Sequence, residues 1–348
     1  MNRAKNAPLT PITPVALQNI SLAGRNTFGL PAIADLAYEI TAPEQLPALM
    51  SEILTLGIPW RVLGGGSNVV LPATLPGAAL LMNISGLTIG DCTDQSTTIT
   101  AGAGENWHNF VAWTLAQNLP GLENLALIPG TVGAAPIQNI GAYGAEVSDY
   151  LDFVEAFDCK EQAFVTLSRQ ECRFAYRDSY FKQNPGRFIV TKVAFKLPKK
   201  WVPRLNYADL AKQFAQTSAA TPQAIFDAVC QIRSNKLPDP KVIGNAGSFF
   251  QNPIVTNSTY EKLLTKHPQL VSYPDANGTR KLAAGWLIDQ CDFKGYRLGP
   301  AGVYEKQALV LVNHGGANAT DILNLAQKIQ TTVQERFGIE LHIEPNIL

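Results

Sequence analysis

The most informative segment of this chain reads Pro129-Gly130-Thr131-Val132-Gly133-Ala134-Ala135-Pro136-Ile137-Gln138-Asn139-Ile140-Gly141-Ala142-Tyr143-Gly144. It contains four glycines and no charged side chain. A loop that faced only solvent would carry more charge. Glycines and small side chains instead allow backbone N–H groups to approach a flat or phosphorylated ligand. We therefore interpret residues 129–144 as a ligand-binding loop.

A second glycine loop lies earlier in the chain and reads Gly64-Gly65-Gly66-Ser67-Asn68. Three consecutive glycines permit positive φ and close approach of backbone N–H groups to an anion. No helix is predicted to start here, which argues against a Walker or Rossmann loop. A glycine-rich hairpin turn is the alternative for this motif alone. Together, the two loops could clamp an extended dinucleotide.

The residues around the first glycine loop predict a compact β-α-β unit. Alternating residues predict a strand at 35–40, and apolar residues at helical spacing predict a helix from Leu46 to Leu54. A short strand at 60–63 follows. Further along, strands at 97–101, 153–157, 164–167 and 188–195 have the spacing of an antiparallel or mixed sheet. The last region predicts a strand at 308–313, a helix at 321–337 and a final strand at 340–344.

One segment imitates a dinucleotide-binding fingerprint. Gly102-Ala103-Gly104-Glu105-Asn106-Trp107 lies between a predicted strand and a predicted helix. Trp107 stands where the third glycine of the fingerprint would be. We prefer a tight strand-to-helix turn over a Rossmann site.

Composition excludes several classes of function. Lys plus Arg and Asp plus Glu both number 28, so no net charge attracts nucleic acid or an anionic membrane. The five cysteines are scattered without a CxxC, and the four histidines are dispersed. We therefore expect no disulfide framework, no metal site and a cytoplasmic location. No apolar stretch approaches the 18 residues of a membrane span.

Three polar residues elsewhere are candidates for catalysis. Arg177, in Phe174-Ala175-Tyr176-Arg177-Asp178-Ser179, could fix a carboxylate, although a surface Arg–Asp pair is the simpler alternative. Ser248, in Gly244-Asn245-Ala246-Gly247-Ser248-Phe249-Phe250, lacks the spacing of a hydrolase elbow. Glu344 lies near the chain's end, where a carboxylate is commonly solvated.

Together these segments resemble the UDP-N-acetylenolpyruvoylglucosamine reductase family, in its order, from Asn26-Thr27-Phe28-Gly29 to Glu344-Pro345. Leu205-Asn206-Tyr207-Ala208-Asp209 resembles the substrate-covering tyrosine loop of the family's type I branch. The resemblance implies an α+β fold with a two-subdomain FAD-binding domain like that of vanillyl-alcohol oxidase, not a Rossmann fold. It implies a flexible lead-in at 1–20, an FAD-binding domain at 21–200 with subdomains about 21–84 and 85–200, and a substrate-binding domain at 201–348 with a lid near Tyr207.

The resemblance also assigns roles to individual residues. Arg177, Ser248 and Glu344 match the family's catalytic positions. Residues that match its non-covalent FAD site are Gly64, Gly65, Gly66, Ser67, Asn68, Gly130, Thr131, Gly133, Ala134, Gly141 and Gly144. Residues that match its UDP-sugar site are Tyr143, Tyr207, Lys236, Asn252 and Gln307.

The activity that the resemblance implies is reduction of the enolpyruvyl ether of a UDP-sugar, with NADPH as co-substrate, on the route to peptidoglycan. Hydride would reach C3 of the enolpyruvyl group from N5 of the flavin, and Ser248 would protonate C2. Arg177 and Glu344 would stabilise the enolate. We expect a monomer. The alternatives are another flavin oxidoreductase of this fold, acting on hydroxy acids or sugars, and a non-catalytic flavin- or nucleotide-binding module.

Overall fold

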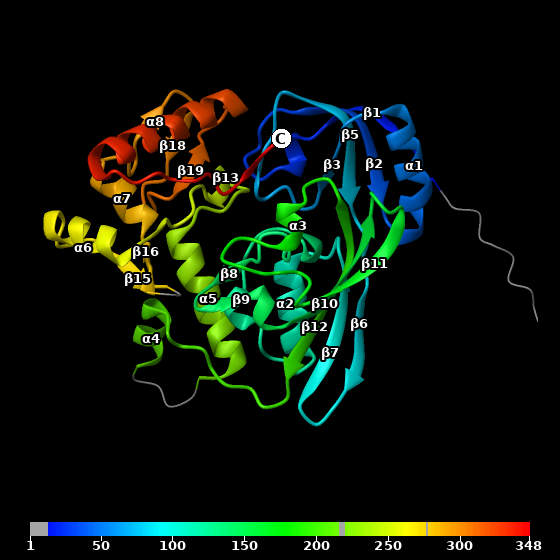
Figure 1. The fold of residues 1–348 in the computed structure, drawn as a ribbon, viewed down its shortest axis with the longest axis horizontal. Coiled ribbons are helices and arrows are strands. Elements are labelled where there is room, and N and C mark those ends of the chain that lie inside the picture. Colours follow the sequence, from blue (N-terminus) through cyan, green and yellow to red (C-terminus); the bar gives the residue numbers. More distant parts are fainter. Residues whose placement is uncertain (1–12, 216–219, 276–277) are drawn as a thin grey trace, which may run out of the picture.

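Three sheet-containing parts meet at the centre of the molecule (Figure 1). The structure is a computed structural model that describes residues 13–215, 220–275 and 278–348. Each part combines helices with a sheet, and the sheets of the second and third parts are antiparallel, so the predicted α+β class is confirmed. No helix within the described ranges is long and apolar enough to cross a membrane.

The first part is a four-stranded sheet covered by one helix. Its strand order is β1 (Leu17–Ser21), β2 (Ile33–Ile40), β5 (Thr74–Met82) and β3 (Trp60–Leu63), with β2, β5 and β3 parallel. Helix α1 (Leu46–Leu56) follows a 3-10 turn at Pro43–Gln45 and buries Leu49, Met50 and Ile53 in the core. Gly57, in the left-handed conformation, ends it. The predicted β-α-β unit is confirmed.

The lead-in predicted for residues 1–20 is shorter in the structure. Residues Leu17–Ser21 form β1, which pairs with β2 in antiparallel register from Leu17 and Ala37 to Ser21 and Ile33. This pairing satisfies the backbone groups on the outer edge of β2, which would otherwise be an open edge. Residues 1–12 lie outside the described part of the chain.

The second part is a five-stranded antiparallel sheet, which contains the four predicted strands and resolves the choice between an antiparallel and a mixed sheet. Its strand order is β11 (Ala163–Ser168), β10 (Leu151–Asp158), β12 (Phe188–Pro198), β7 (Ser96–Gly102) and β6 (Leu87–Cys92). Helix α2 (Trp107–Ala116) packs Phe110 against Phe195 of β12, with ring centroids 5.0 Å apart. A Cβ on Gly104 would lie 2.6 Å from the backbone of Asn83. The glycines before α2 therefore serve a tight turn.

Short elements connect the second sheet to the centre. They are the 3-10 turns η3 (Glu123–Leu125), η4 (Val132–Ala134) and η5 (Val147–Asp149), the hairpin β8 (Gly141–Ala142) and β9 (Ala145–Glu146), and helix α3 (Tyr180–Gln183). The 3-10 turn η1 (Ala23–Arg25) lies between β1 and β2 of the first sheet. Helices α4 (Ala208–Phe214) and α5 (Pro222–Lys236) follow. Leu210, Ile225 and Val229 belong to the same hydrophobic cluster as the second sheet, so both helices share its core.

The third part holds a sheet in the order β13 (Gly244–Ser248), β19 (Val310–Asn313), β18 (Ala301–Val303) and β17 (Arg297–Leu298). Helices α7 (Ala284–Gln290) and α8 (Ala319–Phe337) share a hydrophobic cluster with it. A smaller sheet, β14 (Ile254–Val255), β16 (Arg280–Leu282) and β15 (Ser272–Pro274), lies beside α6 (Asn257–Lys266) (Figure 1).

The strand predicted at 340–344 is wrong. This segment meets residues 249–251 at a single bridge between Phe250 and Ile343, which is too short for a ladder. Pro345 follows and has no backbone N–H, so it cannot donate a hydrogen bond to a neighbouring strand. The strand lies two residues later, where β20 (Asn346–Ile347) pairs in parallel with β4 (Val69–Val70). The end of the chain is thereby attached next to the first glycine loop.

Candidate active site

A cavity of about 620 Å³ lies where the two glycine loops meet. All five residues of the first loop line it, and Thr131, Gly133 and Ala134 of the second loop line it as well. Its volume is within the range of sites for small molecules and cofactors. The two loops that the sequence singles out therefore form one site, although they are far apart in the sequence.

The glycines of the first loop are required by how closely the loops pack. A Cβ on Gly64 would lie 2.5 Å from Oγ1 of Thr131, and a Cβ on Gly65 would lie 3.0 Å from Cα of Gly130. Gly66 has φ +59°, and a Cβ there would overlap the backbone oxygen of Arg25. Larger residues would push the loops apart. The result is a backbone-lined cradle that fits the phosphates and ring of a dinucleotide.

The remaining predicted cofactor residues occupy other places. Gly130 contacts the side chain of Ser67, whose Oγ donates to the Pro129 carbonyl at 3.1 Å. Gly141 and Gly144 belong to the β8–β9 hairpin and are not among the residues that line the cavity. The Gly141 carbonyl instead accepts a hydrogen bond from Nη2 of Arg177 at 2.9 Å. The hairpin therefore lies on the side of the predicted catalytic residues.

Asn68 joins the first loop to two distant segments. Its Nδ2 donates to Oε1 of Gln138 at 2.7 Å and to the backbone carbonyl of Glu344 at 3.4 Å. The backbone N–H of Asn346 donates to the Asn68 carbonyl at 2.9 Å. One amide thus connects both glycine loops to the segment that carries Glu344. Sequence reasoning missed Gln138 and Asn346, and both line the cavity.

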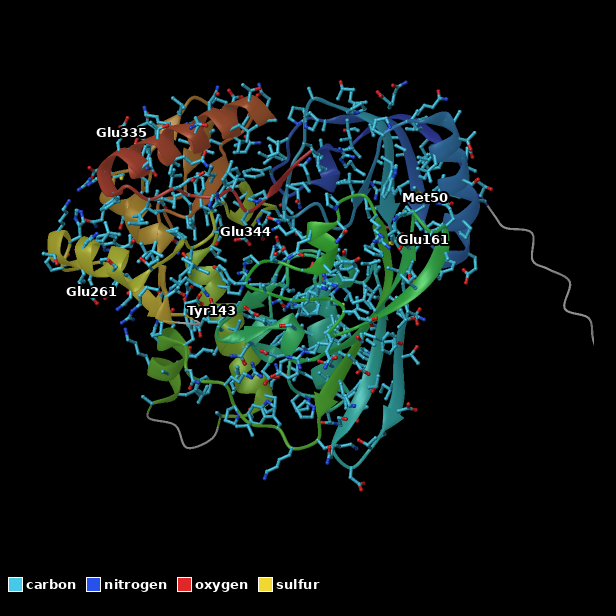
Figure 2. The ribbon with its side chains drawn as sticks, viewed as in Figure 1. Met50, Tyr143, Glu161, Glu261, Glu335 and Glu344 are labelled. Carbon is cyan, nitrogen blue, oxygen red and sulfur yellow. The ribbon has the colours of Figure 1, made fainter. Side chains whose placement is uncertain are left out.

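Arg177 forms an ion pair with Glu344, which lies near the centre of the molecule (Figure 2). Nε of Arg177 lies 3.2 Å from Oε1 of Glu344, and the side chains are 19% and 11% exposed. That N–H is not directed at the oxygen, so it is a buried donor without a hydrogen bond. Arg177 also has φ +53°, an uncommon backbone conformation. A ligand carboxylate could use this donor.

Burial raises the pKa of Glu344 above its ordinary value. The positive charges of Arg177 and Lys182 oppose this rise in the pKa. Lys182 is held nearby because its Nζ donates to the Arg177 carbonyl at 2.8 Å. Glu344 is therefore a carboxylate whose charge is only partly compensated, in a position where a neutralising partner or proton would be favoured.

Ser248 lies on a chain segment next to that of Glu344. It ends β13, and the following residue, Phe249, accepts the backbone N–H of Glu344 at 2.9 Å. Within the described residues, the Ser248 hydroxyl makes no side-chain hydrogen bond. The partly exposed hydroxyl is thus available to a ligand. The three predicted catalytic residues come from separate parts of the chain and are brought to one region.

The predicted substrate residues Tyr143 and Tyr207 contact each other directly. Their ring centroids are 4.9 Å apart with an interplanar angle of 68°. Burial raises the pKa of Tyr207 to about 12, so its hydroxyl remains a donor at neutral pH. Lys236 lies at the end of α5, and its Nζ forms an ion pair with Oδ2 of Asp209 in α4 at 2.5 Å. Tyr143 comes from the β8–β9 turn, so the contact joins two segments.

Asn252 and Gln307 lie on the other side, near Ser248. Oδ1 of Asn252 accepts the backbone N–H of Ala284 at 2.9 Å. Oε1 of Gln307 accepts the N–H of Leu309 at 3.3 Å, and the Leu309 carbonyl accepts the N–H of Phe249 at 2.8 Å. Both amides are therefore fixed by the backbone, and Gln307 is linked to the segment that holds Ser248.

Arg233 is a charged residue that sequence reasoning missed. It lies in α5, and burial lowers its pKa. Its Nε donates to the Leu127 carbonyl at 3.2 Å, and no carboxylate within the described residues forms an ion pair with it. Tyr143, Arg177 and Tyr207 are close enough to interact with its charge. The sequence does hold a signal for Arg233: it lies three residues before Lys236, so a helix places both cations on the same side.

The side chains gathered beside the dinucleotide cradle suit an anionic ligand. Arg177, Arg233 and Lys236 supply positive charge, and two tyrosines and two amides supply hydrogen-bond donors. Groups of three or more His, Cys, Asp or Glu side chains that could hold a metal are absent from the described residues. The chemistry available is therefore binding of an anionic ligand next to a proton donor.

Comparisons with known proteins identify the family of the chain. Residues 239–348 match the family model described as "UDP-N-acetylenolpyruvoylglucosamine reductase, C-terminal domain", and residues 34–166 match "FAD binding domain". The chain is 65% identical to the UDP-N-acetylenolpyruvoylglucosamine reductase of Polynucleobacter asymbioticus, over 100% of both chains. It is 51% identical to that of Bordetella pertussis, over 98% of both. The crystal structure of the Thermus caldophilus reductase is similar, with a TM-score of 0.64 and 25% identity over 96% of this chain and 98% of that one.

Proposed function

The chain belongs to the UDP-N-acetylenolpyruvoylglucosamine reductase family, and from this membership we propose which of its residues carry the reaction. The protein is an FAD-dependent oxidoreductase with NADPH as co-substrate. It reduces UDP-N-acetylenolpyruvoylglucosamine to UDP-N-acetylmuramate, a step of peptidoglycan precursor synthesis. We further propose that it acts in the cytoplasm, which its five free cysteines support, and that it is a monomer.

The cradle between the glycine loops is our proposed FAD site. Its support is the backbone surface that Gly64, Gly65 and Gly66 leave open, together with the lining by Thr131 and Ala134. When bound, FAD supplies an acceptor for the hydride of NADPH and a donor of hydride to the sugar. Ser67, Asn68, Gly130 and Gly133 complete the proposed set, while Gly141 and Gly144 would act through the shape of the hairpin.

Arg177 and Glu344 would hold and polarise the carboxylate of the enolpyruvyl group. Arg177 has a buried donor without a hydrogen bond, and Glu344 has a raised pKa. As hydride adds at C3, negative charge grows at C2 and spreads into the carboxylate. A fixed guanidinium beside that carboxylate stabilises the charge more in the transition state than in the ground state.

Ser248 would donate the proton that C2 receives. Its hydroxyl is free of hydrogen bonds to side chains within the described residues, and its strand adjoins the Glu344 segment. Serine is a weak acid, but a carbanion is a strong enough base to take its proton. The serine alkoxide left behind would be reprotonated from solvent before the next turnover.

The UDP part of the substrate would lie along the cationic and aromatic side of the cleft. Lys236 and Arg233 suit a diphosphate, and Tyr143 and Tyr207 would cover it. Asn252 and Gln307 would orient the sugar from the opposite side. This division supports the proposed domains, with FAD held by residues 21–200 and substrate held mainly by residues 201–348.

The observation that carries these assignments is that Arg177 and Glu344 meet beside the cradle, joined to it through Asn68. The test is an anaerobic titration of the purified protein. NADPH should bleach the flavin absorbance, and the UDP-enolpyruvyl sugar should restore it with one equivalent. A flavin that is restored by oxygen and not by the sugar would instead support an oxidase of hydroxy acids or sugars.

A further inference from the structure

Asn124 is a buried amide that connects two segments of the proposed substrate site. It belongs to η3 and is 1% exposed. Its Nδ2 donates to the backbone carbonyl of Tyr143 at 2.8 Å and to that of Arg204 at 3.0 Å. Tyr143 carries one of the two contacting rings, and Arg204 is three residues before Tyr207, which carries the other. One side chain thus holds the backbone behind both rings.

The orientation of this amide follows from its partners. Both partners are carbonyl oxygens, so the NH₂ group must face them and the Oδ1 atom must point away. Oδ1 is buried and has no hydrogen bond. A buried acceptor without a partner is costly, but an amide flip would lose both hydrogen bonds and turn Oδ1 toward two carbonyl oxygens. The two bonds to the tyrosine-bearing segments are therefore what keeps the side chain in this orientation.

The Tyr143 segment needs such support because its backbone is strained. Tyr143 has φ +49°, a conformation that residues other than glycine seldom adopt. A fixed hydrogen bond to its carbonyl helps to hold that conformation. The bond also sets the direction of the Tyr143 ring, which contacts Tyr207 edge to face at 4.9 Å.

The other segment is anchored at its start and free of regular structure afterwards. Nε1 of Trp201 donates to Oε1 of Glu123 at 2.5 Å, and Arg204 pairs with Asp149. Residues 205 and 206 are in neither helix nor strand, and α4 begins at Ala208. Asn124 therefore donates hydrogen bonds both to the Tyr143 carbonyl and to the lid segment, defined here as residues 201–207.

We propose that Asn124 is a positioning residue that sets Tyr143 and Tyr207 together as a single aromatic cover over the UDP-sugar. The inference rests on the proposed function, because the ligand beneath the two rings is taken to be the UDP-sugar substrate. Asn124 acts through the two tyrosines and need not touch the substrate. Its loss should weaken binding of the sugar, with little effect on reduction of the flavin by NADPH.

The experiment combines two variants of Asn124 with one of Tyr207. Asn124→Ala removes both donors, and Asn124→Asp keeps the shape but replaces the donors by oxygens. We expect each to raise the KM for the UDP-enolpyruvyl sugar roughly tenfold, the size of about one lost hydrogen bond. Stopped-flow bleaching by NADPH should stay within about twofold of wild type.

A double-mutant cycle separates positioning from a general loss of stability. Once Tyr207→Ala has removed one ring of the cover, Asn124→Ala or Asn124→Asp should raise the KM by less than about twofold more. Asn318→Ala is the matched control, because it removes a capping amide of α8 far from the cleft and lowers the melting temperature without touching the cover. It should leave the KM unchanged.

The outcomes are distinguishable from failure of the proposed function. If wild-type protein does not pass hydride to the UDP-sugar, the function itself is wrong. If wild type does so but the Asn124 variants leave the KM unchanged, or their effects add fully to that of Tyr207→Ala, the positioning role is overturned. Should Asn124→Asp fail to fold, because it buries a carboxylate against two carbonyl oxygens, Asn124→Ala introduces no charge and carries the same cycle.

Discussion

Arg177 and Glu344 form a mostly buried ion pair across 3.2 Å, yet the pKa of Glu344 is raised and not lowered. Burial therefore outweighs the attraction of the guanidinium. A buried carboxylate in this situation destabilises the folded protein while it is charged. Such a cost is expected where function, and not stability, requires the residue.

Glu344→Gln should therefore stabilise the protein at neutral pH while it lowers activity. Because the folded-state pKa is raised, the wild-type carboxyl loses stability as pH rises from about 4.3, its unfolded value, through the folded value. The variant cannot ionise, so its advantage in free energy of unfolding should grow over that window and vanish below it. Reoxidation of the flavin by the UDP-sugar should slow about 10²-fold.

Urea unfolding at several pH values, with Glu340→Gln as control, measures the first effect. Glu340 is an exposed carboxylate on the same segment. An advantage of Glu344→Gln that is independent of pH would show that ionisation of Glu344 is not its source.

Tyr207→Ala should raise the KM for the UDP-sugar and leave bleaching of the flavin by NADPH near the wild-type rate. The ring packs on Tyr143, and we propose that it covers the bound substrate, since such covers complete a site when the substrate arrives. We expect a change of roughly tenfold or more in KM. Tyr207→Phe keeps the ring and should stay much closer to wild type. Steady-state kinetics that show an unchanged KM for Tyr207→Ala would mean that the ring does not cover the substrate.

Gly66→Ala should prevent retention of FAD. The residue has φ +59°, and a Cβ would overlap the Arg25 carbonyl, so the loop must shift. The cost of such overpacking is about 1–3 kcal/mol. Gly24→Ala is the control, since nothing lies within 4 Å of its added Cβ. The ratio of flavin to protein absorbance after gel filtration measures retention. In wild type, denaturation followed by filtration should release all flavin, because the binding is non-covalent.

The two glycine loops could be located from sequence because their composition is local. Glycine runs without charge stand out, and the structure brings both loops to one cavity. The β-α-β unit and the antiparallel second sheet were predicted for the same reason, from alternation and helical spacing. The roles of Arg177, Ser248 and Glu344 came from the resemblance, since each residue alone had a simpler interpretation.

The contacts that assemble the site could not be predicted in this way. Asn68 bonds to Gln138 and to Glu344, which are 70 and 276 residues away. Asn124 reaches Arg204 across 80 residues. No local sequence pattern predicts such hydrogen-bonded pairs, because hydrogen bonds between distant segments depend on the complete fold. The final strand was misplaced for a related reason, since β20 forms only where β4 offers it a partner.

Ser248→Ala is the most decisive variant because it separates the two half-reactions. Transfer of hydride from NADPH to FAD needs no proton donor at C2 of the sugar, so bleaching should be normal. Protonation of C2 does need a donor, and general-acid catalysis contributes typically ~10²–10⁴-fold. Reoxidation by the UDP-sugar should therefore slow by at least about a hundredfold.

Ser248→Cys and Ser258→Ala sharpen this test. A thiol at residue 248 can donate a proton from nearly the same place, so the cysteine variant should retain part of the activity. Ser258 is exposed on α6, and its alanine variant should behave as wild type. Stopped-flow absorbance follows both half-reactions in each protein.

If the flavin of Ser248→Ala is reoxidised at the wild-type rate, the proton comes from another group, and Ser248 is only the last residue of β13. Since that hydroxyl has no side-chain hydrogen bond within the described residues, its removal should leave the fold intact, and the two half-reactions can be compared directly.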